Sequence, residues 1–187
     1  MPEVWLVRHA ETEWSKAGRH TGRTDVPLTE AGRAAAAGLH ERLAGRSFAH
    51  VFASPLQRAR ETARLAGFGD GSVALRDELL EWDYGEYEGI TTADIRRSRP
   101  GWYLWRDGVP GGESPAEVAA RCDRLVAELA ALDGDACCVA HGHILRALTA
   151  RWLQRPVDLG GQLPLETGAV CVLGWERDTR ALVAWNA

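Results

Sequence analysis

The chain has 187 residues, of which 45% are hydrophobic and 26% are charged, proportions that are ordinary for a globular protein with a substantial core. Its formal net charge of −4 argues against nonspecific binding to nucleic acid or to an anionic membrane, because both need a basic surface. No apolar run approaches the length of a membrane span, and Met1-Pro2-Glu3 leads straight into the first predicted strand, so we expect a cytoplasmic protein with no nucleic-acid or membrane partner.

The cysteines and the continuity of the pattern indicate how the chain is organised. Cys122, Cys137, Cys138 and Cys171 form no CxxC pair, so we expect reduced and mostly buried thiols. No repeat, low-complexity tract or interdomain linker interrupts the chain. We therefore expect one domain over residues 1–187, with a short lid-like insertion at about 90–112.

The first third of the chain alternates apolar strands with helical patterns. Residues 4–7 predict a short buried strand, and a polar loop follows over about 11–27. Thr29 is a candidate N-cap for an alanine-rich helix that runs to about residue 46. His50–Ala53 predicts a second strand, after which Ser54-Pro55 is expected to cap and begin the next helix.

The middle of the chain contains the least regular pattern. Residues 73–75 predict a third strand, and an acidic and aromatic stretch follows over 79–89. The segment 90–112 is rich in tryptophan and looks like an insertion over the edge of the sheet. Ser114-Pro115-Ala116-Glu117 combines a capping box with proline at the first helical position, which predicts a helix to about Leu132.

The last third predicts a central strand, a helix and an edge hairpin. Residues 136–140 form the strand, a helix after His141 ends near Leu153, and strands at 169–175 and 181–185 would pair antiparallel. This order predicts a three-layer α/β/α sandwich with a mostly parallel central sheet and an antiparallel edge. The exposed hairpin could pair with a second copy to form a homodimer or be shielded by its charges, and the sequence leaves both open.

Five polar residues follow predicted strands closely enough to meet at one edge of that sheet. They are Arg8, His9, Arg58, Glu81 and His141. In open α/β sheets the crevice beyond the carboxyl ends of the strands is where ligands bind. Arginine forks match phosphate oxygens, a neutral imidazole can attack phosphorus, and a carboxylic acid can protonate a leaving oxygen. This set of side chains suffices to move a phosphoryl group without a metal.

The arrangement of these residues in sequence blocks resembles the histidine phosphatase superfamily, also called the phosphoglycerate mutase-like family. The blocks occur in the family's order and span nearly the whole chain. They are residues 6–12 (LVRHAET), 18–22 (GRHTG), 25–29 (DVPLT), 54–63 (SPLQRARETA), 81–89 (EWDYGEYEG), 112–114 (GES) and 139–142 (VAHG).

The resemblance implies a role for each of the five residues. His9 becomes phosphorylated, and Arg8, Arg58 and His141 bind the phosphoryl group that is transferred. Glu81 donates a proton to the leaving group and then serves as base for water, with Asp83 as the second choice for this role. No cofactor and no metal is implied.

The resemblance also implies a second group of residues that touch the substrate: Ser15, Thr21, Gly22 and Gly142. The amide of Gly142 is expected at a helix N-terminus, where partial positive charge favours an oxyanion. The chain departs from the family's pattern at two positions. Ala10 stands where glycine is usual, which excludes a strongly positive φ, and Ser15 stands where many relatives have asparagine, which changes or removes one phosphate contact.

The remaining histidines allow a metal site as an alternative. His141-Gly142-His143 could belong to a metal site, but the further ligands that zinc or iron needs do not occur at matching spacing. His143 is then expected to be structural or to line the pocket. His20, His40 and His50 are expected to be surface histidines or histidines with their hydrogen bonds satisfied.

The resemblance favours a metal-independent phosphomonoesterase acting on a small phosphorylated metabolite such as a sugar phosphate. The segment between Gly89 and Gly112 is short compared with that of cofactor-dependent phosphoglycerate mutases, and the acid motif looks like that of small broad-specificity acid phosphatases and sugar-bisphosphate phosphatases. A mutase and a non-catalytic phospho-ligand binder remain the alternatives. Trp102, Tyr103 and Trp105 are expected to pack the 90–112 segment, which we expect to influence substrate preference.

Overall fold

The central sheet has the composition that the sequence predicts. A computed structural model describes residues 1–69 and 71–187, and in that part of the chain six strands form one sheet in the order β3-β2-β4-β1-β5-β6. Parallel pairs join β1 to β4, β4 to β2 and β2 to β3, whereas β5 pairs antiparallel with β1 and with β6. The strands are β1 (Val4–Arg8), β2 (His50–Ala53), β3 (Ala74–Leu75), β4 (Ala136–Ala140), β5 (Val170–Glu176) and β6 (Thr179–Ala184).

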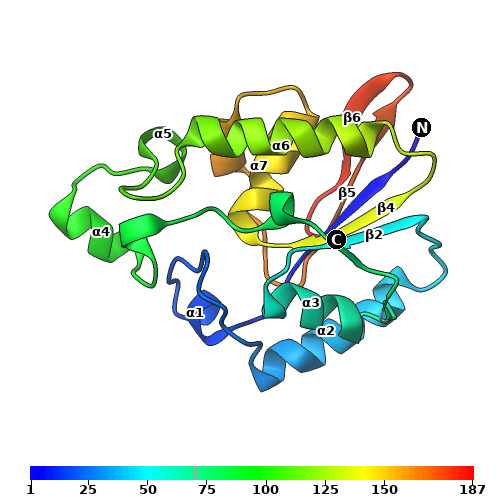
Figure 1. Ribbon diagram of the computed structural model, residues 1–187, viewed down its shortest axis with the longest axis horizontal. Coiled ribbons are helices and arrows are strands. Elements are labelled where there is room, and N and C mark those ends of the chain that lie inside the picture. The colour runs from blue at the N-terminus through cyan, green and yellow to red at the C-terminus, as the bar shows by residue number, and fades with distance from the viewer. Residues whose placement is uncertain (70) are drawn as a thin grey trace.

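Helices cover both faces of this sheet, which makes the three-layer sandwich (Figure 1). Helices α2 (Glu30–Leu43) and α3 (Gln57–Leu65) cover one face, and α6 (Pro115–Ala130) and α7 (Gly142–Trp152) cover the other. Side chains of a strand point alternately to the two faces, so β1 contributes to two cores. Its residues Val4 and Leu6 join the core under α6 and α7, while Trp5 and Val7 join the core under α2 and α3.

Two helices begin where the sequence predicts, with the expected caps. The Thr29 hydroxyl accepts a hydrogen bond of 2.9 Å from the Gly32 amide at the start of α2. At the start of α6, Ser114 and Glu117 form the capping box, in which each side chain accepts from the other's backbone amide. Each cap satisfies amides that the first helical turn leaves unpaired.

The start of α3 differs from the prediction. This helix begins at Gln57, two residues after Pro55, and Leu56 in the N-cap position has no side chain that could cap it. The Gln57 amide instead donates a 2.8 Å hydrogen bond to Asp25, which lies 32 residues earlier in the chain. A tertiary contact therefore replaces the local cap that Ser54 was expected to supply, and the Ser54 hydroxyl is left for the site described below.

The 90–112 segment, which we call the lid segment, extends to one end of the molecule (Figure 1). It contains α4 (Thr92–Ser98) and α5 (Leu104–Asp107). Trp102 and Trp105 are only 2% and 4% exposed, which confirms that they pack the segment, whereas Tyr103 is 36% exposed and differs from that expectation. The Trp102 indole donates to the Gly108 carbonyl, and Trp105 meets Trp82 edge to face. Helix α1 (Glu13–Lys16) lies in the long loop after β1.

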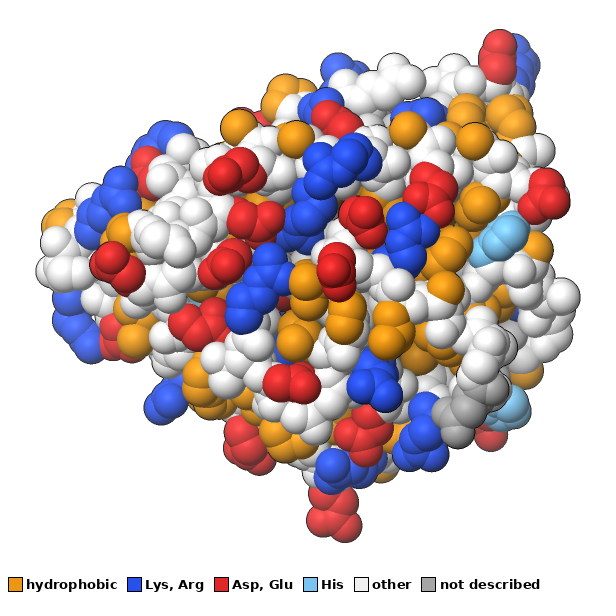
Figure 2. Space-filling model, in the orientation of Figure 1, with side chains coloured by type: hydrophobic (Ala, Val, Ile, Leu, Met, Phe, Trp, Pro, Cys, Tyr) orange, Lys and Arg blue, Asp and Glu red, His pale blue; other side chains and the backbone are white. Residues whose placement is uncertain are grey.

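The surface in view mixes acidic and basic side chains without a large field of one sign (Figure 2). Within the described residues no helix has the length and apolar character that crossing a membrane requires. Strand β6 forms one edge of the sheet, as predicted, and Val183 on it is 56% exposed. Pairing of this edge with a second copy stays a prediction.

Candidate active site

Four of the five key residues meet where β1 and β4 end. Arg8 ends β1 and His9 follows it, His141 follows β4, and Arg58 lies in the first turn of α3. Because β1 and β4 are parallel neighbours, their carboxyl ends lie side by side, and the rings of His9 and His141 are 5.2 Å apart between centroids. We call these four residues the floor of the site. His9, Arg58 and His141 are 4% exposed or less.

A backbone hydrogen bond orients the His9 ring. Its Nδ1 lies 2.7 Å from the Ala10 carbonyl oxygen, which can only accept, so Nδ1 carries the proton. Nε2 then keeps its lone pair. Burial, reinforced by the positive charges of Arg58 and Arg8, lowers the pKa of His9 well below its ordinary value. The ring is therefore neutral and can act as a nucleophile through Nε2.

The second histidine has the opposite tautomer. Arg58 Nε donates to His141 Nδ1 over 3.1 Å, so the proton of His141 is on Nε2, which donates to the Ser54 hydroxyl over 2.7 Å. Burial and the nearby Arg58 charge lower the pKa of His141 well below its ordinary value. His141 is thus a neutral hydrogen-bond donor, and Ser54 and Arg58 hold its orientation.

The loop after α1 holds the Arg58 guanidinium from below. The terminal nitrogens of Arg58 donate to the carbonyl oxygens of Thr21, Gly22 and Thr24 over 3.1, 3.0 and 2.9 Å. Together with the bond to His141, these contacts restrain both the position and the plane of the guanidinium. A lysine could not reproduce this arrangement, because an ammonium is a single point charge without a planar fork.

Arg8 presents a buried donor that has no partner. One terminal nitrogen donates to the Leu165 carbonyl oxygen, but Nε is buried and makes no hydrogen bond with the described residues. A Cβ on Gly142 would come 3.3 Å from this guanidinium, so glycine lets the start of α7 lie directly against it. A buried N–H without an acceptor is costly, whereas an anionic oxygen at this point would satisfy it.

Glu81 lies across from the floor at the start of α7. Its Oε1 accepts from the amides of Trp82 and Ile144 over 2.9 and 2.8 Å, and its Oε2 accepts from the His143 amide over 2.9 Å. Oε2 therefore has more room for a proton than Oε1. Asp83, the second choice, pairs with Arg23 and accepts from the Gly85 amide, and it does not line the pocket.

A pocket of about 250 Å³ lies above the floor. It is lined by Arg8, His9, Ser15, Gly18, Arg19, His20, Thr21, Glu81, Tyr84, Thr92, Gly142, His143, Arg146 and Leu165. The structure thus brings most of the expected site residues to one cavity. Arg58 and His141 lie beneath it.

Two of the expected substrate contacts are engaged elsewhere. Gly22 lies behind the pocket wall, where its amide donates to Glu88 over 2.9 Å and its carbonyl accepts from Arg58. Ser15 lines the pocket, but its hydroxyl forms the capping box of α1 with Thr12. The structure therefore places Gly22 as a support for Arg58 and not in the cavity wall.

Comparison with known proteins agrees with this geometry. A model of the histidine phosphatase superfamily (branch 1) matches residues 4–187. The chain belongs to the histidine phosphatase superfamily. It is 42% identical over 188 residues to an acid phosphatase of Mycobacterium tuberculosis, covering 95% of this chain and 88% of that protein. It is 35% identical over 197 residues to a sedoheptulose 1,7-bisphosphatase of Saccharomyces cerevisiae, covering 89% of this chain and 71% of that protein.

A solved structure of the same fold has a comparable sequence identity to this chain. The product of an open reading frame of Mycobacterium tuberculosis superposes with a TM-score of 0.94 at 40% identity, covering 99% of this chain and 97% of that one. With relatives named as phosphatases at 35% and 42% identity, this histidine phosphatase is a phosphoric monoester hydrolase. The predicted family, fold and enzyme class are confirmed.

The outer wall of this histidine phosphatase's pocket consists of His143, which was expected to be structural or to line the pocket, and of residues that sequence reasoning did not place there. We define the outer wall as Arg19, His20, Thr92, His143 and Arg146. Arg146 donates through Nε to the Gly160 carbonyl over 2.8 Å, and its guanidinium lies 5.1 Å from the centre of the Trp105 ring. Arg146 follows Gly142 by four residues on α7, so helical spacing was a signal that could have found it.

The histidines of the outer wall differ in part from expectation. His20 was expected at the surface or satisfied; it is 9% exposed, lines the pocket, and its Nε2 lies 3.2 Å from the Thr92 hydroxyl. Burial lowers the pKa of His20 to about 4. His143 lines the pocket, and its Nδ1 accepts from the buried Tyr84 hydroxyl. By contrast, His50 pairs with Asp133 away from the pocket, as expected.

The two histidines of the HGH motif in this phosphatase have separate partners. His141 bonds Arg58 and Ser54, whereas His143 bonds Tyr84. In the part of the chain that the structure describes, no three side chains of histidine, cysteine, aspartate or glutamate come together as a metal site requires. The hydrogen bonds of the motif are therefore those of a polar pocket.

Proposed function

We propose that His9 Nε2 is the nucleophile of a two-step phosphomonoesterase reaction. The observation that carries this proposal is the His9 ring itself, which is neutral, is held by the Ala10 carbonyl through Nδ1, and lines the same pocket as Arg8. In the first step an Nε2–P bond forms and the P–O bond to the leaving alcohol breaks. In the second step water attacks phosphorus, the N–P bond breaks, and inorganic phosphate leaves with His9 neutral again.

Glu81 is the proposed acid and base of both steps. In the first step it transfers a proton to the leaving oxygen, and in the second it takes one from the attacking water. Its carboxyl group lines the pocket, and Oε2 accepts only one hydrogen bond. The proton is therefore exchanged between Glu81 and the leaving oxygen or the attacking water, and it does not pass through His9.

The floor and the start of α7 are the proposed phosphoryl-binding groups. Arg8 and Gly142 line the cavity, so the Arg8 guanidinium and the Gly142 amide are the proposed donors to two of the phosphoryl oxygens. Arg58 and His141 lie below them, and the His141 Nε2–H can exchange its acceptor from Ser54 to an anionic oxygen. These donors stabilise the negative charge of the group being transferred.

The proposed substrate is a small sugar phosphate. The pocket volume of about 250 Å³ suits a small metabolite. Arg19 and Arg146 in the outer wall add positive charge beyond the phosphoryl site, and Arg146 has no carboxylate partner among the described residues. This charge favours substrates with a second anionic group. The names of the relatives, which include a sugar bisphosphatase, support the same class.

The test is hydrolysis of p-nitrophenyl phosphate between pH 4 and 8 with EDTA present, for the wild type and His9→Ala. Turnover that survives EDTA and is lost in His9→Ala supports the proposal, and mass spectrometry of acid-sensitive phosphate on His9 identifies the intermediate. Turnover that needs an added metal, or that persists in His9→Ala, contradicts it. Ligand binding without turnover in the wild type would favour a phospho-ligand binder.

We also propose that the reaction takes place in the cytoplasm. Cys122, Cys137, Cys138 and Cys171 are free and buried. Adjacent free thiols such as Cys137 and Cys138 are typical of a reducing compartment.

A further inference from the structure

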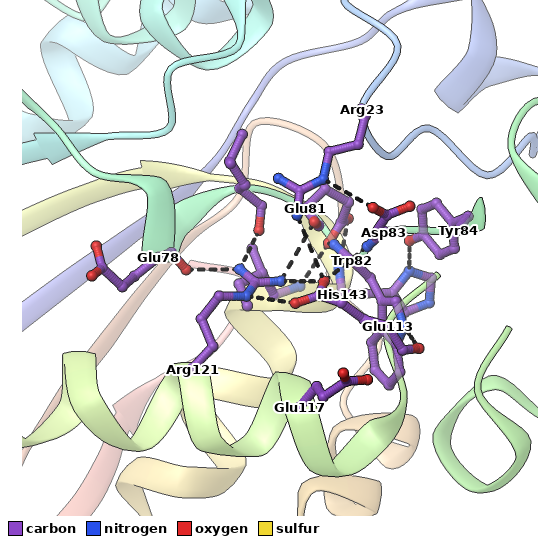
Figure 3. Close-up of polar contacts among 12 residues, drawn as sticks. Arg23, Glu78, Glu81, Trp82, Asp83, Tyr84, Glu113, Glu117, Arg121 and His143 are labelled. Carbon is purple, nitrogen blue, oxygen red and sulfur yellow. Dashed lines mark hydrogen bonds and ion pairs between the residues drawn. The ribbon is translucent and has the colours of Figure 1, made fainter. Parts of the chain in front are cut away.

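We propose that Arg121 and Glu113 are positioning residues for Glu81, and that protonation of the leaving group depends on them. The two side chains form an ion pair beneath the loop that carries Glu81 (Figure 3). The inference rests on the proposed function of Glu81 as acid. Neither residue lines the pocket, so any effect on the reaction acts through the loop.

Arg121 holds the first half of the loop from helix α6. One terminal nitrogen donates to the carbonyl oxygens of Glu78 and Leu80 over 2.9 and 2.6 Å, and the other reaches the Glu81 carbonyl at 3.5 Å. The same guanidinium donates to both carboxylate oxygens of Glu113 over 2.9 and 2.7 Å. Arg121 is 8% exposed, so these bonds compete little with water.

Glu113 holds the second half of the loop. Its Oε2 accepts from the Asp83 amide over 2.9 Å, and its own amide donates to the Asp83 carbonyl over 3.0 Å. The carbonyl oxygen of Glu113 accepts from the Trp82 indole over 2.8 Å. Glu81 is therefore placed between two segments, both of which are held by the same ion pair.

The loop depends on this pair because it has no ladder or helix of its own. Residues 81–84 adopt no regular secondary structure between a short turn at 77–79 and another at 85–87. On its other side the Glu81 carboxylate bonds the amides of His143 and Ile144 at the start of α7. The Arg121–Glu113 ion pair therefore fixes the distance from α6 to the loop, and the Glu81 carboxylate connects the loop to α7.

A displacement of Glu81 affects substrates unequally. A stable leaving anion such as p-nitrophenolate departs with little help from an acid, whereas an alkoxide from a sugar or glycerol needs a proton as the bond breaks. A small error in the position of a catalytic group is enough to lose this help. A purely structural role for the pair would lower the amount of active enzyme and would reduce all rates by one factor.

The test compares kcat/KM for p-nitrophenyl phosphate, phenyl phosphate and glycerol 3-phosphate in Arg121→Lys and Glu113→Gln. Arg121→Lys keeps the charge and removes the fork, and Glu113→Gln keeps the backbone bonds to Trp82 and Asp83 and removes the ion pair. We expect the loss for glycerol 3-phosphate to exceed the loss for p-nitrophenyl phosphate by roughly 10-fold to 100-fold. Equal losses for all three substrates would overturn the proposal.

The matched control is Arg151→Lys. Arg151 of α7 forms a similar two-pronged pair with Asp123 of α6, over 2.7 and 3.1 Å, but neither residue lines the pocket or bonds the Glu81 loop. We expect this variant to treat the three substrates alike. A leaving-group effect in Arg151→Lys as large as that in Arg121→Lys would show that helix packing, and not the grip on the loop, is responsible, and would overturn the proposal.

A double variant separates an action through Glu81 from an independent effect. If Arg121 works through Glu81, then Arg121→Lys adds little to the loss already caused by Glu81→Gln with glycerol 3-phosphate. If the losses of the two single variants multiply in the double variant, the proposal is overturned. The proposal is also overturned if Glu81→Gln shows no leaving-group dependence. In that case, loss of turnover in His9→Ala would still support His9 as the nucleophile. Where Arg121→Lys fails to fold, Glu113→Gln carries the same comparison.

Discussion

The floor and the outer wall of the pocket are assembled in different ways. Arg8, His9 and His141 follow directly from the ends of neighbouring parallel strands, so the sheet itself sets their spacing. The outer wall draws on a loop, the lid segment and the second turn of α7, and packing against Trp105 and Tyr84 holds it. A rigid floor suits a fixed chemical step, and a wall made of separate segments suits selection among leaving groups. Changes to the floor should therefore lower kcat, and changes to the wall should alter KM.

The largest expected effect is at the nucleophile. His9→Ala removes a pocket-lining imidazole whose Nδ1 is held by the Ala10 carbonyl and whose Nε2 keeps its lone pair, so we expect kcat for p-nitrophenyl phosphate to fall by at least about 10⁴-fold. The measurement is initial rate in the presence of EDTA. His50→Ala, which changes a histidine paired with Asp133 away from the pocket, is the control and should keep wild-type rates. If His9→Ala kept turnover within tenfold of the wild type, His9 would not be the nucleophile.

A smaller but still large effect is expected for Arg58→Lys. The lysine keeps a positive charge but loses the planar contacts to His141 and to the three carbonyls of the loop. We expect kcat to fall by roughly 10²-fold to 10³-fold with a smaller change in KM. Arg60→Lys, two residues along on the exposed side of α3, supplies the control. If KM changed and kcat did not, Arg58 would act in substrate binding alone.

The outer wall should show the converse pattern in Arg146→Met, which keeps methylene packing on Trp105 and removes the charge. We expect KM for fructose 1,6-bisphosphate to rise by about 10-fold, because the substrate's second phosphate loses its cation. For p-nitrophenyl phosphate, which has no second anion, we expect a change of less than about 3-fold. Arg124→Met on the outer face of α6 is the control. Equal changes for both substrates would show that floor and wall are not separate.

The smallest expected effect is on stability. Burial lowers the pKa of His9, His20, His141 and His143 below the ordinary value of 6.5, to about 4 for His20. Below pH 6.5 the unfolded chain therefore binds protons that the folded chain does not. The stability that these histidines contribute is fully present above pH 6.5, and the free energy of unfolding falls as the pH drops towards 4. Thermal unfolding from pH 7.5 to 5 should show Tm falling by several degrees.

His20→Phe tests which part of the molecule causes this slope. The variant removes one titrating group from the outer wall and leaves the floor untouched, so the fall of Tm with acid should become shallower. A slope that does not change in His20→Phe would assign the pH dependence to His9, His141 and His143.

The sequence determined the parts of this protein that depend on neighbours in the chain. Short apolar runs located β1, β2 and β4, and the capping residues Thr29 and Ser114 located the starts of α2 and α6. Since polar residues that follow parallel strands emerge at one edge of the sheet, the same pattern was enough to propose Arg8, His9 and His141 as one site. Arg58 and Glu81 were proposed for the same site from their places after strands, the family blocks supplied the roles, and the pocket contains or overlies all five residues.

Only the tertiary structure decided the features that depend on distant contacts. The Gln57 amide, at the start of α3, bonds Asp25, and Gly22 bonds both Glu88 and Arg58. The outer wall and the grip of Arg121 on the Glu81 loop likewise join segments about 40 or more residues apart. Hydrogen bonds of this kind follow from how helices and loops pack over a sheet, and no local propensity encodes them.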